Sequence, residues 1–496
     1  MEINIPVKYS ETIDLALDTM DKDKQALIFV NTKSSAEKQA EEISKKIDES
    51  KEEWDFISKE ALQALSTPTK QCKRLADCLK KGIAFHHSGL NNKQRELIED
   101  NFRNGVIKII CCTPTLAAGL DLPAYRAILK DLKRFTSQGM RYIPVLEYLQ
   151  MAGRAGRPKF DTIGEAICIC KDENQKEEIE NMYIYGKAED IYSKLAAEPV
   201  LRTYVLSLIA TEFVKDKEQL MDFFKKTFFA HQYKDLQQME LLLMRVIAML
   251  EEWEFIKVKK ESNDSFFSSA DSLGKEEYTA TLVGKRVSEL YLDPLTANEL
   301  IKGLNKSKSK NEFSYLHLVS NTLEMRPLLS VTKKESEDLE EKTELSREFI
   351  LNEDDLFEDY YYFMSSVKTA WFFEDWISEK SEDKLMEKFN IRPGEIKFKC
   401  DIADWLLYSC HELANILMLK EQLSDITKLR LRLKYGVKEE LLPLVKIKNI
   451  GKNRARKLFD NGFKSIKELR KADLSTLKLL VGDKTAVNIK KQLLMN

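Results

Sequence analysis

Two arginines stand three residues apart near the end of the first third of the chain, and each follows a glycine. They lie in the string Gln150-Met-Ala-Gly153-Arg154-Ala-Gly156-Arg157-Pro158. A spacing of three places both side chains on one side of a helical turn. Guanidinium groups are planar, multidentate donors that suit a phosphoryl group whose charge must be stabilised during transfer. Arg154 and Arg157 are therefore the candidate catalytic residues.

Three further polar segments each follow a short apolar run. They are Asn31-Thr32-Lys33-Ser34-Ser35, His86-His87-Ser88-Gly89-Leu90 and Thr113 to Pro123. Hydroxyls before a helix are good N-caps, and a helix N-terminus attracts phosphate. Helix capping alone remains the alternative for the first segment. The two adjacent histidines have no Cys, Asp or Glu at ligand spacing, so no metal site is predicted.

The elements that must position these residues are alternating strands and helices. The expected strands cover residues 26–30, 83–86, 107–112, 126–129 and 165–170, with helical segments between most of them. This alternation predicts a parallel, doubly wound α/β sheet. Ligands of such sheets bind at the carboxyl ends of the strands, where the polar segments fall.

Together these segments resemble motifs of the second RecA-like motor domain of superfamily 2 helicases. The forms Gln-x-x-Gly-Arg-x-Gly-Arg-Pro and His-His-Ser-Gly-Leu resemble the Ski-like branch, and within it the archaeal DNA-repair helicases related to HelQ. The resemblance implies that Arg154 and Arg157 meet the γ-phosphate of ATP. It assigns Asp121, Gln150 and Gly153 to the nucleotide. It also implies a set of residues near the translocated DNA strand: Thr32, Lys33, His87, Ser88 and Thr113.

The segment from Lys133 to Tyr142 lies between the last two motifs. Relatives place a strand-separating β-hairpin there, and Phe135, Met140 and Tyr142 would then stack on the first unpaired bases. A plain surface hairpin is the alternative.

The remainder of the chain is expected to hold three more domains, after a motor domain over residues 1–197. The resemblance predicts a winged helix over residues 198–290 and an all-α ratchet domain over residues 291–427. In the ratchet helix, Trp405 would stack on a base, with Lys397 and Lys399 as basic neighbours. Relatives carry a basic residue seven positions before the tryptophan, where this chain has Phe398.

Residues 428–496 are strongly basic, and their sequence predicts a helix-hairpin-helix domain. They carry 19 Lys and Arg but 6 Asp and Glu, although the whole chain has a net charge of -2. An apolar-Gly turn followed by a basic helix can hold a DNA phosphate without reading sequence. Gly451, Lys452 and Arg454 are the candidate residues for this contact.

Two motifs of a complete motor are missing from the sequence. None of the Gly-Lys pairs is followed by Ser or Thr, and no Asp-Glu-x-His or Asp-Glu-Ala-Asp box occurs. We therefore expect the chain to lack the first motor domain, with the gene split or the chain truncated. The ligands of Mg²⁺ and part of the ATP site would then come from a separate chain in the split-gene case.

Composition limits the remaining choices. Eight cysteines in 496 residues do not form a disulfide framework, and no apolar run is long enough to span a bilayer. A cytoplasmic location and no membrane partner are expected. The predicted function is the C-terminal part of an ATP-dependent 3′ to 5′ DNA helicase acting on single-stranded and forked DNA in repair or fork restart. An RNA-remodelling helicase subunit and a DNA-binding accessory protein without motor role are the alternatives.

Overall fold

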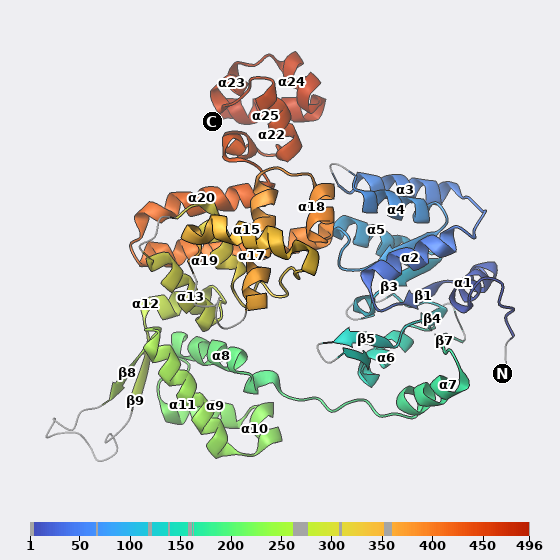
Figure 1. Ribbon diagram of the computed structural model, residues 1–496, viewed down its shortest axis with the longest axis horizontal. Coiled ribbons are helices and arrows are strands. Elements are labelled where there is room, and N and C mark those ends of the chain that lie inside the picture. Colours follow the sequence, from blue (N-terminus) through green and yellow to red (C-terminus); the bar gives the residue numbers. More distant parts are fainter. Residues whose placement is uncertain are drawn as a thin grey trace. The chain divides into compact units, whose positions relative to one another are not determined.

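The computed structural model describes residues 4–65, 68–117, 122–136, 139–156, 161, 163–260, 276–306, 310–351 and 360–495 (Figure 1). The chain divides into two compact units. Unit 1 contains Met1–Asp190 together with Glu382–Lys397, and unit 2 contains Ile191–Ser381 and Phe398–Asn496. The segment 382–397 lies within the expected ratchet domain in sequence, whereas in the structure it packs with the motor domain.

Unit 1 is built on a five-stranded parallel sheet with the strand order β2-β3-β1-β4-β7. Its strands are β1 (Ala26–Phe29), β2 (Ile83–His86), β3 (Ile109–Cys112), β4 (Arg126–Leu129) and β7 (Glu165–Cys168). All four residues of each of β1 to β4 are buried, as expected for strands covered on both faces. The parallel sheet predicted from the sequence is therefore confirmed.

Helices connect and cover these strands. The helices of unit 1 are α1 (Glu11–Asp21), α2 (Lys33–Ser44), α3 (Glu52–Gln63), α4 (Lys70–Leu79), α5 (Asn92–Arg103), α6 (Val145–Ala152), α7 (Glu173–Ile179), α18 (Glu382–Phe389) and the start of α19 (Pro393–Ile416). Helix α2 contacts β2 and β3, and α6 contacts β4. A small antiparallel hairpin, β5 (Lys133–Thr136) with β6 (Gly139–Tyr142), precedes α6.

Unit 2 begins with helices followed by a two-stranded ribbon. These elements are α8 (Glu198–Ala210), α9 (Lys217–Lys225), α10 (Phe228–Tyr233), α11 (Leu236–Glu252), β8 (Ile256–Lys260), β9 (Glu276–Ala280) and α12 (Leu282–Glu289). The two strands pair antiparallel. Helices followed by a β-ribbon form the winged-helix arrangement expected here.

The next part of unit 2 is helical. Its helices are α13 (Pro294–Asn305), α14 (Glu312–Ser320), α15 (Ser336–Ser346), α17 (Tyr360–Ile377), the remainder of α19 and α20 (Lys420–Tyr435). Apolar side chains of α17 and α19, such as Phe372 and Leu407, are fully buried. Among the described residues, no helix combines the length and the apolar character that a membrane span requires.

The carboxyl-terminal helices pack around an apolar core of their own. They are α21 (Leu442–Val445), α22 (Lys452–Asp460), α23 (Ile466–Lys471), α24 (Leu474–Val481) and α25 (Asp483–Met495). Gly482, between the last two, has a φ of 86°, a conformation that favours glycine. Each of the two glycines, Gly451 and Gly482, stands directly before a helix, and the first marks the helix-hairpin-helix turn that the sequence predicted.

Candidate nucleic-acid and nucleotide site

A groove of about 710 Å³ lies at the carboxyl edge of the unit 1 sheet. Its lining includes residues from the loops after β1, β2 and β3 and from α6: Thr32, Lys33, Ser88, Thr113 and Gln150. These residues come from four separate motifs of the sequence. Parallel pairing brings them together because the three loops leave the sheet at one edge.

The hydroxyl groups of the groove are held by local structure. Thr32 is the N-cap of α2, and its Oγ1 accepts from the backbone N–H of Ser35 at 3.0 Å. Thr113 Oγ1 lies 2.9 Å from Thr115 Oγ1. Ser88 is exposed in the turn after β2. The Thr32 hydroxyl therefore caps α2, and the same exposed side chain also lines the groove.

Hydrogen bonds tie the groove to the start of the hairpin. The backbone N–H of Asn31 donates to Asp131, and the Asn31 side-chain amide donates to the carbonyl of Lys133 at 3.1 Å. On the hairpin, Phe135 pairs across the ribbon with Met140, and their side chains are 79% and 58% exposed. Two large apolar side chains thus project into solvent beside a polar groove.

The other predicted hairpin residue, Tyr142, lies at the base. Its hydroxyl donates to Glu178 at 2.6 Å, and Lys133 Nζ lies 4.1 Å from the centroid of its ring. Tyr142 also makes an edge-on contact with Tyr183. It therefore braces the hairpin, whereas Phe135 is the open aromatic.

The arginine string follows α6 and is paired with the segment before β4. Arg154 Nη2 donates to the carbonyl of Ala117, in the loop after β3. The backbone N–H of Ala124 donates to Arg154 O at 2.9 Å. Gly153 is the exposed C-cap of α6. Two of the predicted residues, Asp121 and Arg157, lie outside the described residues.

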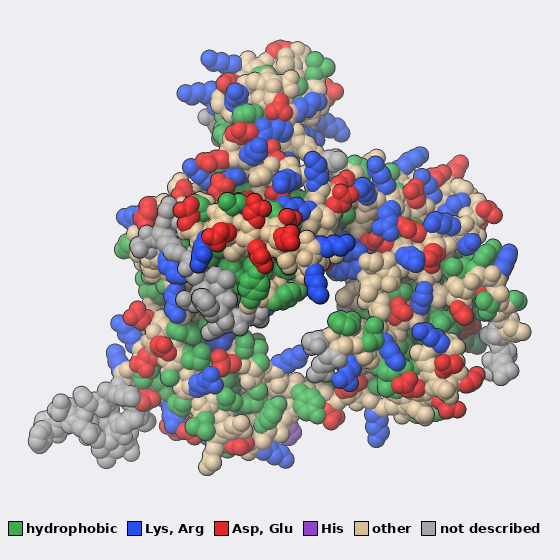
Figure 2. Space-filling model, in the orientation of Figure 1, with side chains coloured by type: hydrophobic (Ala, Val, Ile, Leu, Met, Phe, Trp, Pro, Cys, Tyr) green, Lys and Arg blue, Asp and Glu red, His purple; other side chains and the backbone are tan. Residues whose placement is uncertain are grey.

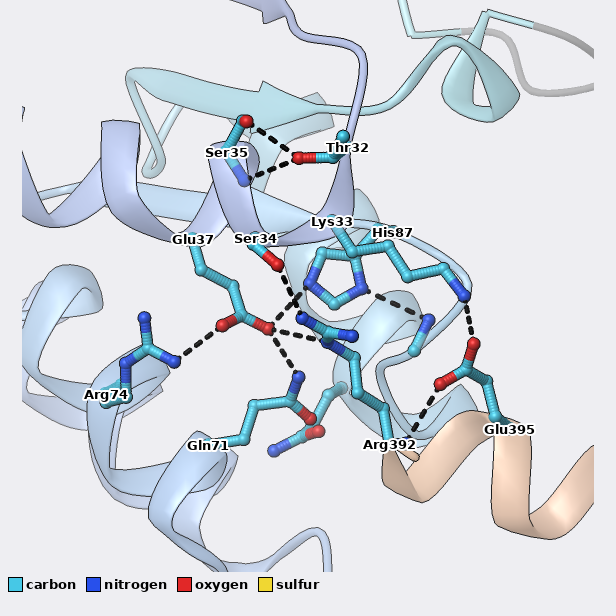
Figure 3. Close-up of polar contacts among 12 residues, drawn as sticks. Thr32, Lys33, Ser34, Ser35, Glu37, Gln71, Arg74, His87, Arg392 and Glu395 are labelled. Carbon is cyan, nitrogen blue, oxygen red and sulfur yellow. Dashed lines mark hydrogen bonds and ion pairs between the residues drawn. The ribbon is translucent and has the colours of Figure 1, made fainter. Parts of the chain in front are cut away.

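His87 is fully buried, which corrects the prediction of a direct contact with the strand. Its Nε2 lies 3.2 Å from Glu37 Oε1, and its Nδ1 accepts from the backbone N–H of Gly89 at 3.1 Å (Figure 3). Only a neutral ring protonated at Nε2 satisfies both bonds. Burial, partly offset by the Glu37 carboxylate, lowers the pKa of His87. The buried ring therefore positions the Ser88 turn through its hydrogen bond with the backbone of Gly89.

On α19, the predicted ratchet residues differ in their surroundings. Trp405 is half-buried, and its Nε1 donates to the carbonyl of Leu290 at 3.1 Å. Phe398, seven residues earlier and so on the same face, is 58% exposed, and Lys397 is exposed.

Lys399 corrects the sequence prediction of a DNA contact. Its side chain is buried, and its ammonium group donates to the carbonyls of Met325 and Pro327. A lysine that satisfies two buried carbonyls from within unit 2 is a structural cap.

In the carboxyl-terminal domain the basic residues of α22 fall into two groups. Lys452 donates to the carbonyl of Lys380 at 3.1 Å, and Arg456 pairs with Glu379 and Glu440. Arg454 is exposed, and its Nη1 donates to the carbonyl of Asn449 beside the Gly451 turn. Figure 2 shows Lys and Arg side chains on the visible surface of these helices. Arg454 therefore faces solvent while Arg456 is neutralised within unit 2.

Two residues of unit 1 were missed by the sequence reasoning. Glu37, within α2, accepts hydrogen bonds from Gln71, His87 and Arg392, and it pairs with Arg74 (Figure 3). Arg392 precedes α19, 355 residues further along the chain. The sequence offered one local indication of this contact. Glu37 falls on the buried face of an amphipathic helix, and a buried charge needs hydrogen-bond or ion-pair partners.

The first testable consequence concerns the ionisation of His87. We expect its ring to be neutral at pH 7, with the proton on Nε2, and to protonate only below its ordinary pKa of 6.5, because burial opposes the charge. Its contribution to the free energy of unfolding should be complete above about pH 6.5 and should decrease below it, since the unfolded ring takes up the proton first. The measurement is ¹⁵N NMR of labelled histidine, which is practical with five histidines. The His87→Gln variant assigns the resonance, and a charged ring at pH 7 would contradict the hydrogen-bond geometry.

Four family models match the chain in succession. They are the helicase conserved C-terminal domain over residues 56–159, a helix-turn-helix domain over 164–257, the archaeal helicase domain 4 over 313–436 and a SAM-like helix-hairpin-helix tandem over 441–493. Within the part of the chain that the structure describes, no cluster of His, Cys, Asp or Glu could hold a metal ion.

Curated relatives align with nearly the whole chain. The ATP-dependent DNA helicase Hel308 of Methanococcus vannielii is 39% identical over 92% of this chain, and that of Pyrococcus abyssi is 37% identical over 96%. The Methanocella arvoryzae protein of the same name is 38% identical over 97%. The chain spans 64% of the length of each of these relatives. The chain is therefore a homologue of the archaeal Hel308-type superfamily 2 helicases along most of its own length.

Proposed function

We propose that this chain supplies the C-terminal part of an ATP-dependent 3′ to 5′ DNA helicase acting in DNA repair or fork restart. The observation that carries the proposal is the groove in unit 1. It gathers Thr32, Ser88 and Thr113 from three loops and places them beside the hairpin of Phe135. Hydroxyls, a lysine and an exposed aromatic suit the backbone and the bases of a single strand.

The nucleotide role rests on α6 and the string that follows it. Arg154 connects this string to the loop after β3, and Gln150 lines the groove. A charge-stabilising arginine next to the strand-binding loops would link phosphoryl transfer to movement along DNA. Guanidinium groups are multidentate donors and would suit the γ-phosphate of ATP. The phosphate loop and the carboxylates that hold Mg²⁺ would come from a first motor domain, in another part of the protein or in a partner chain.

The hairpin would separate the strands. Phe135 and Met140 are exposed on neighbouring strands, and the hairpin base is braced by Tyr142 and by the ion pair of Arg134 with Glu147. A braced hairpin with two exposed apolar side chains can wedge between base pairs of forked DNA, because stacking on Phe135 replaces the lost base stacking. We also place the activity in the cytoplasm, because the eight cysteines form no disulfide framework.

Arginine function can be tested by reconstitution with a first motor domain. Arg157→Ala should lower DNA-stimulated ATP turnover by about 10³-fold or more, because a transition-state arginine of this kind contributes that much. DNA affinity should change little. The control is Arg103→Ala, which removes an exposed arginine paired with Asp100 on α5. Turnover by Arg157→Ala equal to that of the control would show that this arginine does not face the nucleotide.

If the carboxyl-terminal domain binds DNA, its affinity should fall as salt rises, and replacing one basic residue that contacts a phosphate should make this fall less steep. Arg454→Gln should reduce the slope of log affinity against log salt by about 0.7 for single-stranded DNA, because one fewer phosphate is neutralised. Arg456→Gln is the matched control on the same helix. Its guanidinium is already neutralised by Glu379 and Glu440, so its slope should stay that of the parent. Fluorescence-anisotropy titrations measure both, and an unchanged slope for Arg454→Gln would argue against a phosphate contact.

Base stacking by Trp405 has a prediction of its own. Trp405→Ala should weaken single-strand binding by about 1–3 kcal/mol and leave the melting temperature nearly unchanged. Trp405→Phe keeps an aromatic face but loses the bond to Leu290, so it should retain most of the affinity. If the indole is instead a core residue, alanine will cost about 3–5 kcal/mol of stability and no affinity. Parallel titrations with RNA of the same sequence test the RNA-remodelling alternative.

A further inference from the structure

Arg392 joins the segment before α19 to helix α2 of the motor domain. Its Nε donates to Glu37 Oε1 at 3.2 Å, and its Nη2 donates to Ser34 Oγ at 3.1 Å (Figure 3). All three residues belong to unit 1. One guanidinium therefore spans two residues of the helix that begins at the groove residue Thr32.

Glu37 is the buried carboxylate that accepts the Arg392 hydrogen bond. Its side chain is 5% exposed, and its two oxygens face Gln71, Arg74, His87 and Arg392. Burial raises the pKa of Glu37, but the hydrogen bonds from His87 and Gln71 and the charge of Arg392 outweigh it and lower the pKa to about 2. The carboxylate is therefore ionised, and a buried charge of this kind strongly resists losing a donor.

Two glycines allow the backbones to touch. The N–H of Gly394 donates to the carbonyl of Gly89 at 3.0 Å. A Cβ on Gly394 would lie 2.4 Å from the carbonyl oxygens of Ser88 and Leu90, and a Cβ on Gly89 would lie 2.5 Å from Arg392 Cδ. Any side chain on Gly394 would force the two backbones apart, and one on Gly89 would displace the Arg392 side chain. The turn that carries Ser88 in the groove is thus in direct backbone contact with the first turn of α19.

A second tie runs from the groove to the same turn of α19. Lys33, which lines the groove, forms an ion pair with Glu395. The other oxygen of Glu395 accepts from the backbone N–H of Arg392 at 2.9 Å. Two residues of the groove, Lys33 and Ser88, are therefore each one contact away from the start of α19. The same helix carries Trp405 further along, in unit 2.

We propose that Glu37 and Arg392 are positioning residues that couple the strand-binding groove to helix α19, so that occupancy of the groove by single-stranded DNA is transmitted to the helix carrying Trp405. The inference rests on the proposed function, because a strand must occupy the groove. Movement of the Ser88 turn would pull on Gly394, and movement of Lys33 would pull on Glu395, while the buried ion pair holds Arg392 to α2. Helix α19 would respond as a lever because its backbone is continuous from Pro393 to Ile416.

The test is hydrogen exchange of the full chain with and without a single-stranded oligothymidine. In the parent chain, DNA should slow exchange both in the turn of residues 88–90 and in α19. In Arg392→Lys, the turn should stay protected while the DNA-dependent protection of α19 is lost. Lysine keeps the charge but cannot bond Glu37 and Ser34 together. Glu37→Gln should also reduce the protection of α19 while the turn stays protected, because the amide oxygen can still accept from His87 but carries no charge to hold the guanidinium.

The matched control is Lys70→Ala. Lys70 pairs with Glu387 and so joins the same two segments of unit 1, but both side chains are exposed. It should leave both protections as in the parent. Melting temperatures of all variants confirm that each is folded. Unchanged protection of α19 in both Arg392→Lys and Glu37→Gln would overturn the inference. Protection of α19 without protection of the turn would overturn it too, and protection of neither segment in the parent would overturn the proposed function and the inference with it.

Discussion

The parallel pairing of β1 with both β3 and β4 is the constraint on which the rest of the site depends. Strand β1 lies between them in register, Phe29 opposite Cys112 on one side and Leu129 on the other. The loops after these strands consequently start at the same level of the sheet. Thr32, Thr113 and Asp131 then meet within one groove although about a hundred residues separate the first from the last. The strands contribute mostly buried apolar side chains, with Arg126 at the start of β4 paired to Asp18 and Glu165. The polar residues of the groove come from the loops.

A buried charge imposes a second constraint on the loop after β2. Glu37 requires donors, and one of them is the ring of His87. Because that ring donates from Nε2, its Nδ1 is left to accept from Gly89, and this bond shapes the turn that exposes Ser88. The adjacent histidine, His86, pairs instead with Glu99 on α5. The two histidines of the motif therefore serve separate carboxylates, and neither needs to touch DNA to keep the serine in place.

The fold was accessible from sequence where a pattern is local. Short apolar runs predicted all five strands of the sheet, whereas the hairpin from Lys133 to Tyr142 was expected only from the resemblance to relatives. Whether a given side chain points into the core or into solvent was harder to predict from the sequence. Lys399 and Phe398 are neighbours, and helical geometry turns the lysine inward and the phenylalanine outward, against the expectation from polarity. The inward lysine is tolerated because two carbonyls accept hydrogen bonds from its ammonium group, and no sequence pattern reveals such carbonyls. The pairing of Glu37 with Arg392 was equally hidden, since it joins positions more than 350 residues apart.

The carboxyl-terminal domain shows how a count of basic residues overstates a binding surface. Arg456 pairs with Glu379 and Glu440, and Lys452 caps a carbonyl at the end of the segment after α17. These contacts hold α22 to the helical part of unit 2 and remove cations from the surface that DNA could meet. Arg454 lies between them in sequence but on another face of the helix, next to the Gly451 turn. One short basic helix can thus dock on protein along one face and present the Arg454 guanidinium beside the Gly451 turn on another. Affinity for DNA should therefore depend on which face a residue occupies, because a cation already paired with a carboxylate releases few counterions when a phosphate approaches.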